Sequence, residues 1–481
     1  MGNLLVVVPC RGSAAYLWTL EYAINMKEGG ENVYFMDLAS IESAYSESRF
    51  RWHLERFSRK NSFPNSVERI LKEHGIHQLK LKDFKVDYSK ENDIKNDPIF
   101  QKALRSQYAK WHGDSSITIS DIPTAIVERE GVAFLRGFSV TQQAIQIFKI
   151  NQMATVNGRF VTQAACIYAS IKQGVEYRLL ESIDLPGIRM SVFSNSLHSV
   201  TENRIMMKKS WESATIDSRK LAEEVAIKAI EERLSPNWIW KTKNPIESAL
   251  ESNSYISYFP TSDVEFPVFD SNEETKSQLN QAEVFTLAAR AANDLGLQMV
   301  VRVHPQPLEE HLAYREDEIW KKLCSDNNAL CISSKSSIDS IKLAKNSRLN
   351  IVFASSIALE IGYLGLPLIV TAPTIYSCLI PECEALDEER ILSAIACPPT
   401  LTSKTQIFPY LYYEKMGGAP FVNFEVINMN HAVYNGIWLD EPRLLIFKAR
   451  RFLSTFRERF SQKKFMGTLA DRNNELLVKE D

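Results

Sequence analysis

The sequence lacks a marked excess of either charge: 56 Lys and Arg stand against 59 Asp and Glu in 481 residues, for a formal net charge of -3. A chain so close to neutrality creates no field that would gather nucleic acid over its whole surface, so we expect no nucleic-acid partner. With only 18 Gly and 19 Pro, it also lacks the composition of disordered or fibrous proteins. Its length predicts two or three domains.

No Cys-x-x-Cys pair occurs, and the seven cysteines are scattered along the chain. An odd number without such spacing predicts neither a disulfide framework nor a zinc ribbon. Residues 4–8 form an apolar run too short for a secretory signal, and Val6 stands where a myristoylation motif has Ser or Thr. From these features we expect a cytoplasmic protein.

The longest apolar stretch, residues 351–372, is long enough to suggest a membrane-spanning helix. It is interrupted by Glu360, Gly365 and Pro367, and it divides into strand, turn, short helix and strand. A buried β-α-β unit is therefore the preferred interpretation.

Short apolar runs alternate with helical patterns along most of the chain, which is typical of parallel sheets covered by helices. The predicted fold class is α/β, with two doubly wound units joined by a polar linker at 235–254. In the first half the predicted strands are 4–8, 33–36, 117–119, 132–135 and 175–180, with helices at 14–26, 141–153 and 218–234. In the second half the predicted strands are 255–259, 298–303, 329–332, 349–353 and 366–371, with helices at 275–295, 308–324, 337–344 and 356–364.

Arg302 and His304 stand at the carboxyl end of one predicted strand, where open α/β sheets bind their ligands. Alternation places both side chains on one side of the strand, where they could jointly neutralise a phosphate. Pro305 ends the strand. The alternative is a structural Arg and His that pair with nearby carboxylates.

Two hydroxyl residues, Ser355 and Ser356, follow another strand at the beginning of a predicted helix. Such a turn offers backbone N–H groups, two hydroxyls and the positive end of the helix to an anion. Glu360 interrupts the otherwise apolar helix one turn later, where a carboxylate can accept hydrogen bonds from ribose hydroxyls or hold a base. The alternative is an ordinary serine cap with a solvated glutamate.

These segments resemble the donor half of bacterial capsule polysaccharide biosynthesis glycosyltransferases, the KpsC and KpsS-like β-Kdo transferases. The resemblance covers residues 255–376 well and the first half only weakly. Bacterial polysialyltransferases and glycerol-phosphate polymerases share similar elements. The matching motifs are Arg302-Val303-His304-Pro305, Ser355-Ser356 with Glu360, Gly365-Leu366-Pro367, and Phe259-Pro260-Thr261-Ser262-Asp263 with Gln281.

The resemblance implies a GT-B fold, in which two Rossmann-like domains face a central cleft. Residues 1–240 would form the acceptor domain and residues 250–400 the nucleotide-sugar donor domain. Residues 401–481 would form a helical extension that packs back on the N-terminal domain. The resemblance also implies no metal and no cofactor besides the nucleotide-sugar donor. The donor-binding residues that it implies are Arg302, His304, Ser355, Ser356 and Glu360, with Thr261 and Ser262 near the transferred sugar.

The expected function is transfer of a sugar from a nucleotide-activated donor to a growing capsular or surface polysaccharide or a glycolipid, with CMP-Kdo or a related CMP-acidic sugar as the leading donor. In a metal-free site, His304 would take part in catalysis by stabilising the departing nucleotide phosphate. Two alternatives stay open. One is transfer of a polyol phosphate from a CDP-activated donor, and the other is a non-catalytic GT-B module that binds glycan or acts as a scaffold.

The N-terminal half offers candidates at the ends of its predicted elements. Glu181 follows a strand and is the leading candidate for the acid/base or nucleophilic carboxylate. Asn157 suits a left-handed turn that would direct Arg159 toward the cleft. Gly12 and Ser13 follow the first strand and would line the acceptor side.

Residues 444–465 read as an amphipathic helix with seven basic residues and one acidic residue. Such a helix can lie on an anionic membrane surface, and this predicts peripheral contact with the inner face of the plasma membrane. For the apolar stripe, the preferred interpretation is that it packs on the N-terminal domain, which leaves the basic face in solvent or near lipid-linked acceptors.

Overall fold

The structure is a computed structural model of the chain. Gly12, Ser262 and most of the predicted linker lie outside the described residues, and so does the predicted basic helix at 444–465. The described residues are 2–10, 13–38, 41, 65–86, 88, 91–112, 117–183, 189–194, 199–213, 216–235, 253–261, 279–304, 310–428 and 431–439.

The N-terminal domain is built on a sheet with the strand order β12-β6-β5-β4-β1-β2-β3. The strands from β5 to β3 run parallel, while β6 is antiparallel to β5 and β12 to β6. Both faces of β1 are buried, as expected of a parallel strand covered by helices on each side. The strands are β1 (Asn3–Val8), β2 (Asn32–Asp37), β3 (His77–Leu79), β4 (Gln152–Val156), β5 (Glu176–Glu181), β6 (Arg189–Phe193) and β12 (Ala419–Pro420).

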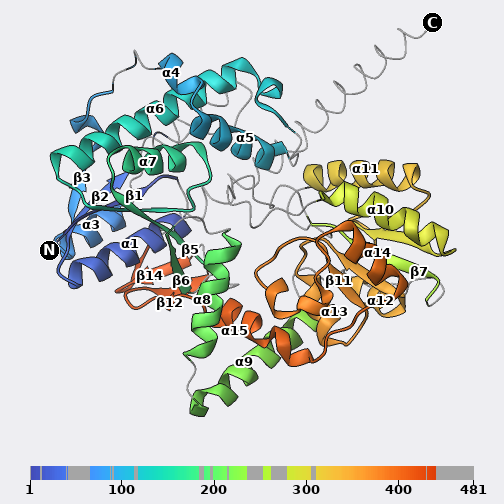
Figure 1. Cartoon of the computed structure of the whole chain (residues 1–481). Helices are drawn as coiled ribbons and strands as arrows, with labels where there is room; N and C mark the ends of the chain where they lie inside the picture. Colours follow the sequence, from blue (N-terminus) through green and yellow to red (C-terminus); the bar gives the residue numbers. More distant parts are fainter. Residues whose placement is uncertain are drawn as a thin grey trace, which may run out of the picture.

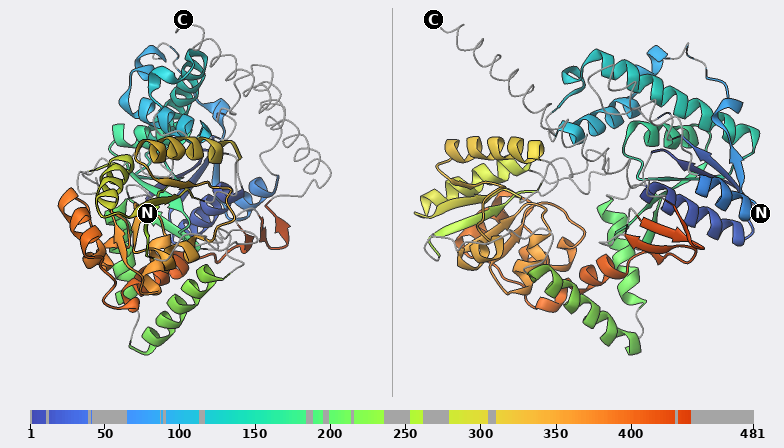
Figure 2. Two further views of the ribbon diagram at one scale, coloured as in Figure 1. Left: turned by 90° about the vertical axis from the view of Figure 1, so that its right-hand side faces the viewer. Right: turned by 180° about the vertical axis from the view of Figure 1, so that it is seen from behind.

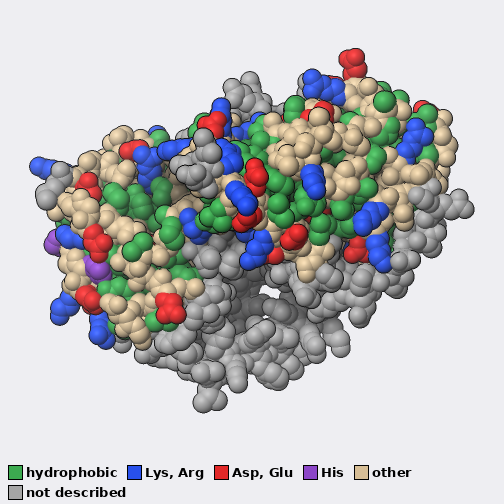
Figure 3. All heavy atoms as spheres, turned by 90° about the horizontal axis from the view of Figure 1, so that it is seen from below, with side chains coloured by type: hydrophobic (Ala, Val, Ile, Leu, Met, Phe, Trp, Pro, Cys, Tyr) green, Lys and Arg blue, Asp and Glu red, His purple; other side chains and the backbone are tan. Residues whose placement is uncertain are grey.

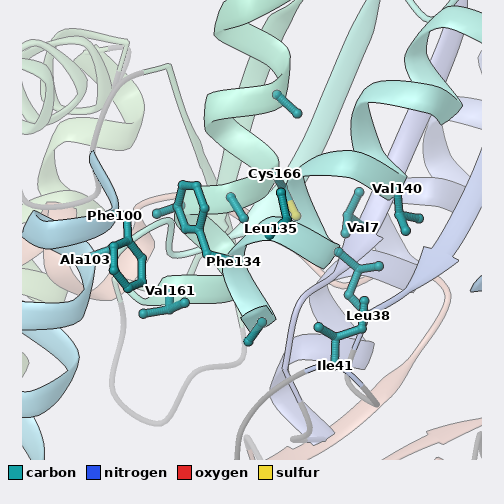
Figure 4. Packing of buried hydrophobic residues seen from close by; sticks show 14 of the residues in the cluster. Val7, Leu38, Ile41, Phe100, Ala103, Phe134, Leu135, Val140, Val161 and Cys166 are labelled. Atoms are coloured by element: carbon teal, nitrogen blue, oxygen red, sulfur yellow. The ribbon is translucent and has the colours of Figure 1, made fainter. Parts of the chain in front are cut away.

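Helices cover this sheet in two layers, which Figure 1 shows on the left of the molecule. The even-numbered side chains of β1 pack with α1 and α3, and the odd-numbered ones with α5, α6 and α7. Figure 4 shows the second layer, in which Phe100 and Phe134 approach each other edge to face, 5.5 Å apart between ring centroids. The helices are α1 (Ser13–Glu28), α3 (Asn65–Glu73), α4 (Glu91–Lys95), α5 (Pro98–His112), α6 (Thr124–Ile147) and α7 (Val161–Lys172).

Two strands predicted in this half are wrong. The apolar run 132–135 lies inside α6, where it forms part of the buried helix face, and 117–119 leads into a short 3-10 helix instead. The predicted helix 141–153 contains the end of α6 and the beginning of β4. Lys149, with φ of 49°, breaks the helix between them. The strands predicted at 4–8, 33–36 and 175–180 are confirmed.

The C-terminal domain has a five-stranded parallel sheet with the order β11-β10-β7-β8-β9, and its predicted strands are all confirmed. Several of its helices begin at a capping residue. For example, the Asn280 side chain caps α10, and Glu283 completes a capping box. The elements are β7 (Tyr255–Phe259), α10 (Gln281–Asp294), β8 (Gln298–Arg302), α11 (Glu310–Asp326), β9 (Leu330–Ile332), α12 (Ser340–Asn346), β10 (Leu349–Val352), α13 (Ile357–Tyr363), β11 (Leu368–Val370) and α14 (Glu388–Ala396).

Each domain therefore has its first strand in the middle of a doubly wound parallel sheet, as in a Rossmann fold. Two such domains in one chain are the GT-B architecture. Three helices connect the domains in Figures 1 and 2, and the last two of them contribute buried residues to the core of the C-terminal domain. They are α8 (Val200–Glu212), α9 (Ile216–Leu234) and α15 (Phe408–Met416).

After α15 the chain returns to the N-terminal domain through strands, so the predicted helical extension is wrong for residues 419–439. Gly418 makes the crossing possible: its φ is +76°, and a Cβ atom there would lie 2.5 Å from the Met190 carbonyl oxygen. The segment adds β12 to the edge of the sheet and then forms a three-stranded antiparallel sheet. Its strands are β13 (Glu425–Asn428), β14 (His431–Tyr434) and β15 (Ile437–Trp438).

This small sheet completes the N-terminal core. Phe424 and Tyr434 are buried in the same apolar cluster as β1 and α1. Glu21, on the buried side of α1, accepts hydrogen bonds from the backbone N–H of Val422 at 2.8 Å and of Asn423 at 3.1 Å. The returning segment is thus held by both apolar burial and a buried carboxylate.

The described surface in Figure 3 carries acidic and basic side chains interspersed with one another. This agrees with the nearly balanced composition of the sequence. Within the described part of the chain, no helix is both long and apolar enough to cross a membrane.

Candidate functional site

Glu181 is the last residue of β5 and lies at the carboxyl edge of the N-terminal sheet, as predicted. Burial raises the pKa of its carboxyl from the usual 4.5 to about 7, although a hydrogen bond from Asn157 acts in the opposite direction. The Asn157 Nδ2 group donates to Glu181 Oε2 at 3.1 Å. A carboxyl that titrates near neutrality can both accept and donate a proton at physiological pH.

The turn after β4 places Asn157 beside Glu181. Asn157 has φ of 59° and Gly158 has φ of 84°, so the predicted left-handed conformation is confirmed. Gly suits position 158, because the φ of 84° would strain an L side chain and an added Cβ atom would also lie 2.6 Å from the end of the Ile167 side chain. The Asn157 Oδ1 atom accepts the Arg159 N–H at 3.1 Å, which stabilises the turn.

Arg159 has a partner within the N-terminal domain. Its Nε atom donates to Ser106 Oγ of α5 at 2.9 Å, and its backbone N–H donates to Gln163 of α7 at 2.9 Å. The guanidinium therefore lies near the carboxyl edge but is tied to α5. Ser13 is the first residue of α1, and its role on the acceptor side stays a prediction.

In the C-terminal sheet, the strand order reverses beside β7, because β8 follows on one side and β10 on the other. Ligands of open α/β sheets bind outside the carboxyl ends of the strands at such a switch point. Thr261 follows β7, His304 follows β8, and Ser355 follows β10, so all three leave the same edge. Two strand spacings, about 10 Å, separate the β8 and β10 ends. The two predicted turns thus flank the switch point together.

The structure corrects the role expected of Arg302. This side chain is only 1% exposed, and its guanidinium donates to backbone carbonyls, including those of Val303 at 3.0 Å and Ser336 at 3.3 Å, as well as that of Ser333. Burial lowers the pKa of Arg302. Arg302 therefore orders the loop after β9, and a direct contact with phosphate is not supported by this geometry. Ser333 and Ser336 lie 31 and 34 residues further along the chain, so no local pattern predicted that Arg302 would bond to their carbonyls.

Asp317 supports the same loop from α11. Its carboxylate accepts hydrogen bonds from the Ser333 hydroxyl at 2.7 Å and from the Ser334 N–H at 2.7 Å. Asp317 was not among the residues predicted from the sequence. With Arg302, it fixes the chain next to the end of β8.

Ser355 and Ser356 lie between β10 and α13, as predicted. Ser356 makes no side-chain cap bond, so the alternative of an ordinary serine cap does not hold at this residue. The buried Tyr376 hydroxyl donates to the Ser355 carbonyl at 2.7 Å. Arg233 of α9 donates to Ser356 Oγ at 3.4 Å. The turn is thus held from two sides.

Glu360 is buried, and its partner is a residue that sequence reasoning missed. Arg233 Nη1 lies 3.5 Å from Glu360 Oε1. The same guanidinium forms a two-pronged pair with Glu414 of α15, one bond being 3.2 Å from Nε to Oε2. Although burial opposes its charge, Glu414 and Glu360 raise the pKa of Arg233. The alternative of a solvated glutamate at 360 is wrong, and contact with ribose or base stays a prediction.

Among the described residues, no group of three or more His, Cys, Asp and Glu side chains is placed to hold a metal ion. The scan against family models finds no match, and no curated protein matches the chain.

Several solved structures are similar to the chain. A Thermosulfurimonas dismutans KpsC, a beta Kdo 2,4 transferase, is 13% identical over 54% of this chain and 78% of its own, with a TM-score of 0.34. A sucrose-phosphate synthase from Thermosynechococcus elongatus is 10% identical over 86% and 95% of the two chains, with a TM-score of 0.28. A UDP-GlcNAc 2-epimerase from Neisseria meningitidis is 12% identical over 88% and 96%, with a TM-score of 0.25.

Proposed function

We propose that the protein is a glycosyltransferase that takes a sugar from a nucleotide-activated donor. The observation that supports this proposal is that Thr261, His304 and Ser355 follow three adjacent parallel strands at the switch point of the C-terminal sheet. Hydroxyls and an imidazole there suit the oxygens of a nucleotide phosphate. In this proposal His304 stabilises the charge that develops on the departing phosphate.

Glu181 supplies the second half of the proposed chemistry. As a carboxylate it would accept the proton of the acceptor hydroxyl that attacks the anomeric carbon. Its pKa of about 7 is suited to this task, because the group is a stronger base than an exposed carboxylate and is still partly ionised at neutral pH. The Asn157 hydrogen bond would hold its orientation.

For the donor we propose CMP-Kdo or another CMP-linked acidic sugar, and for the acceptor a surface polysaccharide or glycolipid assembled at the inner face of the plasma membrane. The residues near the end of β8 and the Ser355-Ser356 turn support this choice through their resemblance to the donor motifs of β-Kdo transferases. Independence from metal ions and a cytoplasmic location stay predictions.

A donor screen by calorimetry tests the proposal. The full chain is titrated with CMP, CDP, UDP and GDP, with and without EDTA. Tight binding of CMP that EDTA leaves unchanged supports the proposal. Strong preference for CDP favours transfer of a polyol phosphate, and absence of binding to every nucleotide favours the non-catalytic scaffold.

A further inference from the structure

Two consecutive residues of the Ser355-Ser356 turn are each connected to a different helix between the domains. The connection of Ser356 is direct, through Arg233 in the last turn of α9. That of Ser355 passes through the loop after β11, because the Tyr376 hydroxyl donates to the Ser355 carbonyl. Arg204 of α8 holds this loop, donating to the Thr374 carbonyl at 2.7 Å and to the Ser377 hydroxyl at 2.9 Å.

Arg233 is well suited to transmit a displacement. It is 3% exposed, and its guanidinium contacts Glu414 of α15, Glu360 of α13 and the Ser356 hydroxyl. A planar guanidinium bonded to three elements fixes their relative positions far better than a lysine ammonium can. Because both carboxylates are buried, the guanidinium cannot leave them without a large cost in free energy.

We propose that Arg233 is a positioning residue, which couples the placement of α9 and α15 between the domains to the placement of Ser356 and Glu360 beside the donor phosphate. The proposal rests on the proposed function, in which the turn binds a nucleotide. A shift of α9 would then move the Ser355-Ser356 turn, to which we assign the nucleotide phosphate, and bound nucleotide would in turn stabilise one position of α9.

The chain contains a matched control. Lys415 and Glu232 form a second ion pair between the same two helices, at 2.7 Å, and within the described residues they make no hydrogen bond or ion pair with the turn. Glu232→Gln therefore weakens the joint between α9 and α15 without touching Ser356. Arg233→Lys keeps the charge of the buried cluster and removes its forked geometry.

The test combines amide hydrogen exchange with nucleotide titration of the full-length chain. In Arg233→Lys we expect exchange in residues 353–361 to quicken about tenfold or more, while the strands of the C-terminal sheet exchange as in the wild type. CMP affinity should fall by about tenfold, the loss expected for one charge-assisted contact. Glu232→Gln should leave both quantities unchanged.

Unaltered exchange at 353–361 in Arg233→Lys would overturn the proposal, as would an equal change in Glu232→Gln. If Arg233→Lys does not fold, Glu414→Gln replaces it and should give a smaller increase in exchange at the same residues. If exchange at 353–361 quickens in Arg233→Lys but the wild-type protein binds none of the nucleotides, the coupling is supported and the proposed function is refuted. The two failures are therefore distinguishable.

Discussion

The two sheets of this molecule have the same strand order around their first strand, but their carboxyl edges carry different chemistry. The N-terminal edge presents Glu181, a carboxyl whose pKa burial raises to about 7. The C-terminal edge presents hydroxyls and an imidazole, with a buried arginine directly behind the Ser356 hydroxyl. One topology thus carries a buried carboxyl at one edge and hydroxyl and imidazole groups at the other, to which we assign proton transfer and anion binding respectively.

The domains also differ in how their cores are completed. The C-terminal sheet is covered by its own helices together with α9 and α15. The N-terminal domain needs Phe424 and Tyr434 from the far end of the described chain to fill the core beside α1. Substitutions at one sheet edge should therefore change either proton transfer or nucleotide binding, but not both. Loss of the returning segment, residues 419–439, should instead lower the stability of the N-terminal domain.

The contrast between the edges is tested most strongly at Glu181. Glu181→Gln preserves the shape of the side chain and removes the base, so kcat should fall about 100- to 10,000-fold with nucleotide affinity unchanged. Steady-state kinetics and calorimetry measure the two quantities. Glu176→Gln, at the opposite end of the same strand, should retain full activity. Full activity in Glu181→Gln would remove the proton-transfer role from this edge.

Substitutions at the carboxyl edge of the C-terminal sheet should instead weaken nucleotide binding. His304→Ala and Ser355→Ala should each reduce nucleotide affinity or turnover by an amount equal to about 1.5–3 kcal/mol, the range for charge-assisted phosphate bonds. His77→Ala, on the exposed edge strand β3, is the control. If both variants bind and turn over substrate like the wild type, the phosphate site is not at this switch point.

The difference in core completion is tested at Glu21. Glu21→Ala leaves the N–H groups of Val422 and Asn423 without their buried acceptor, so the free energy of unfolding should fall by about 1–3 kcal/mol. Urea denaturation measures the change. Glu28→Ala, an exposed position on the same helix, should change stability by less than about 0.5 kcal/mol. Equal effects of the two substitutions would contradict the anchoring role.

The last comparison concerns stability and pH. Because the pKa of Glu181 is raised in the folded state, the native protein binds more protons than the unfolded chain between about pH 4.5 and 7. The contribution of Glu181 to stability therefore decreases as the pH rises through this window. As the pH is raised from 5 to 8, the free energy of unfolding should decrease less in Glu181→Gln than in the wild type. Urea denaturation at each pH measures this difference. If stability depends on pH in the same way in both proteins, the pKa of Glu181 is not raised by folding.

Much of the C-terminal domain was predictable because its strands are short apolar runs bounded by turn residues. The N-terminal half was harder. An apolar cluster on the buried face of a long helix looks like a strand when only neighbours in sequence are considered, which explains the error at 132–135. After α15, the Asn435-Gly436 dipeptide is a local hairpin signal that the predicted helical extension overlooked: both residues have positive φ and form the turn between β14 and β15.

By itself, the sequence determined the α/β class, the repeated strand and helix order of the second half, and the position of Glu181, His304 and Ser355 at strand ends. These features depend on periodicity and on nearby residues. Only the tertiary structure decided that Arg302 would bond to loop carbonyls, that Arg233 would lie between Glu360 and Glu414, and that a small sheet would complete the N-terminal core. Each of these depends on partners between about thirty and four hundred residues apart, and burial makes such pairing obligatory without leaving a local pattern.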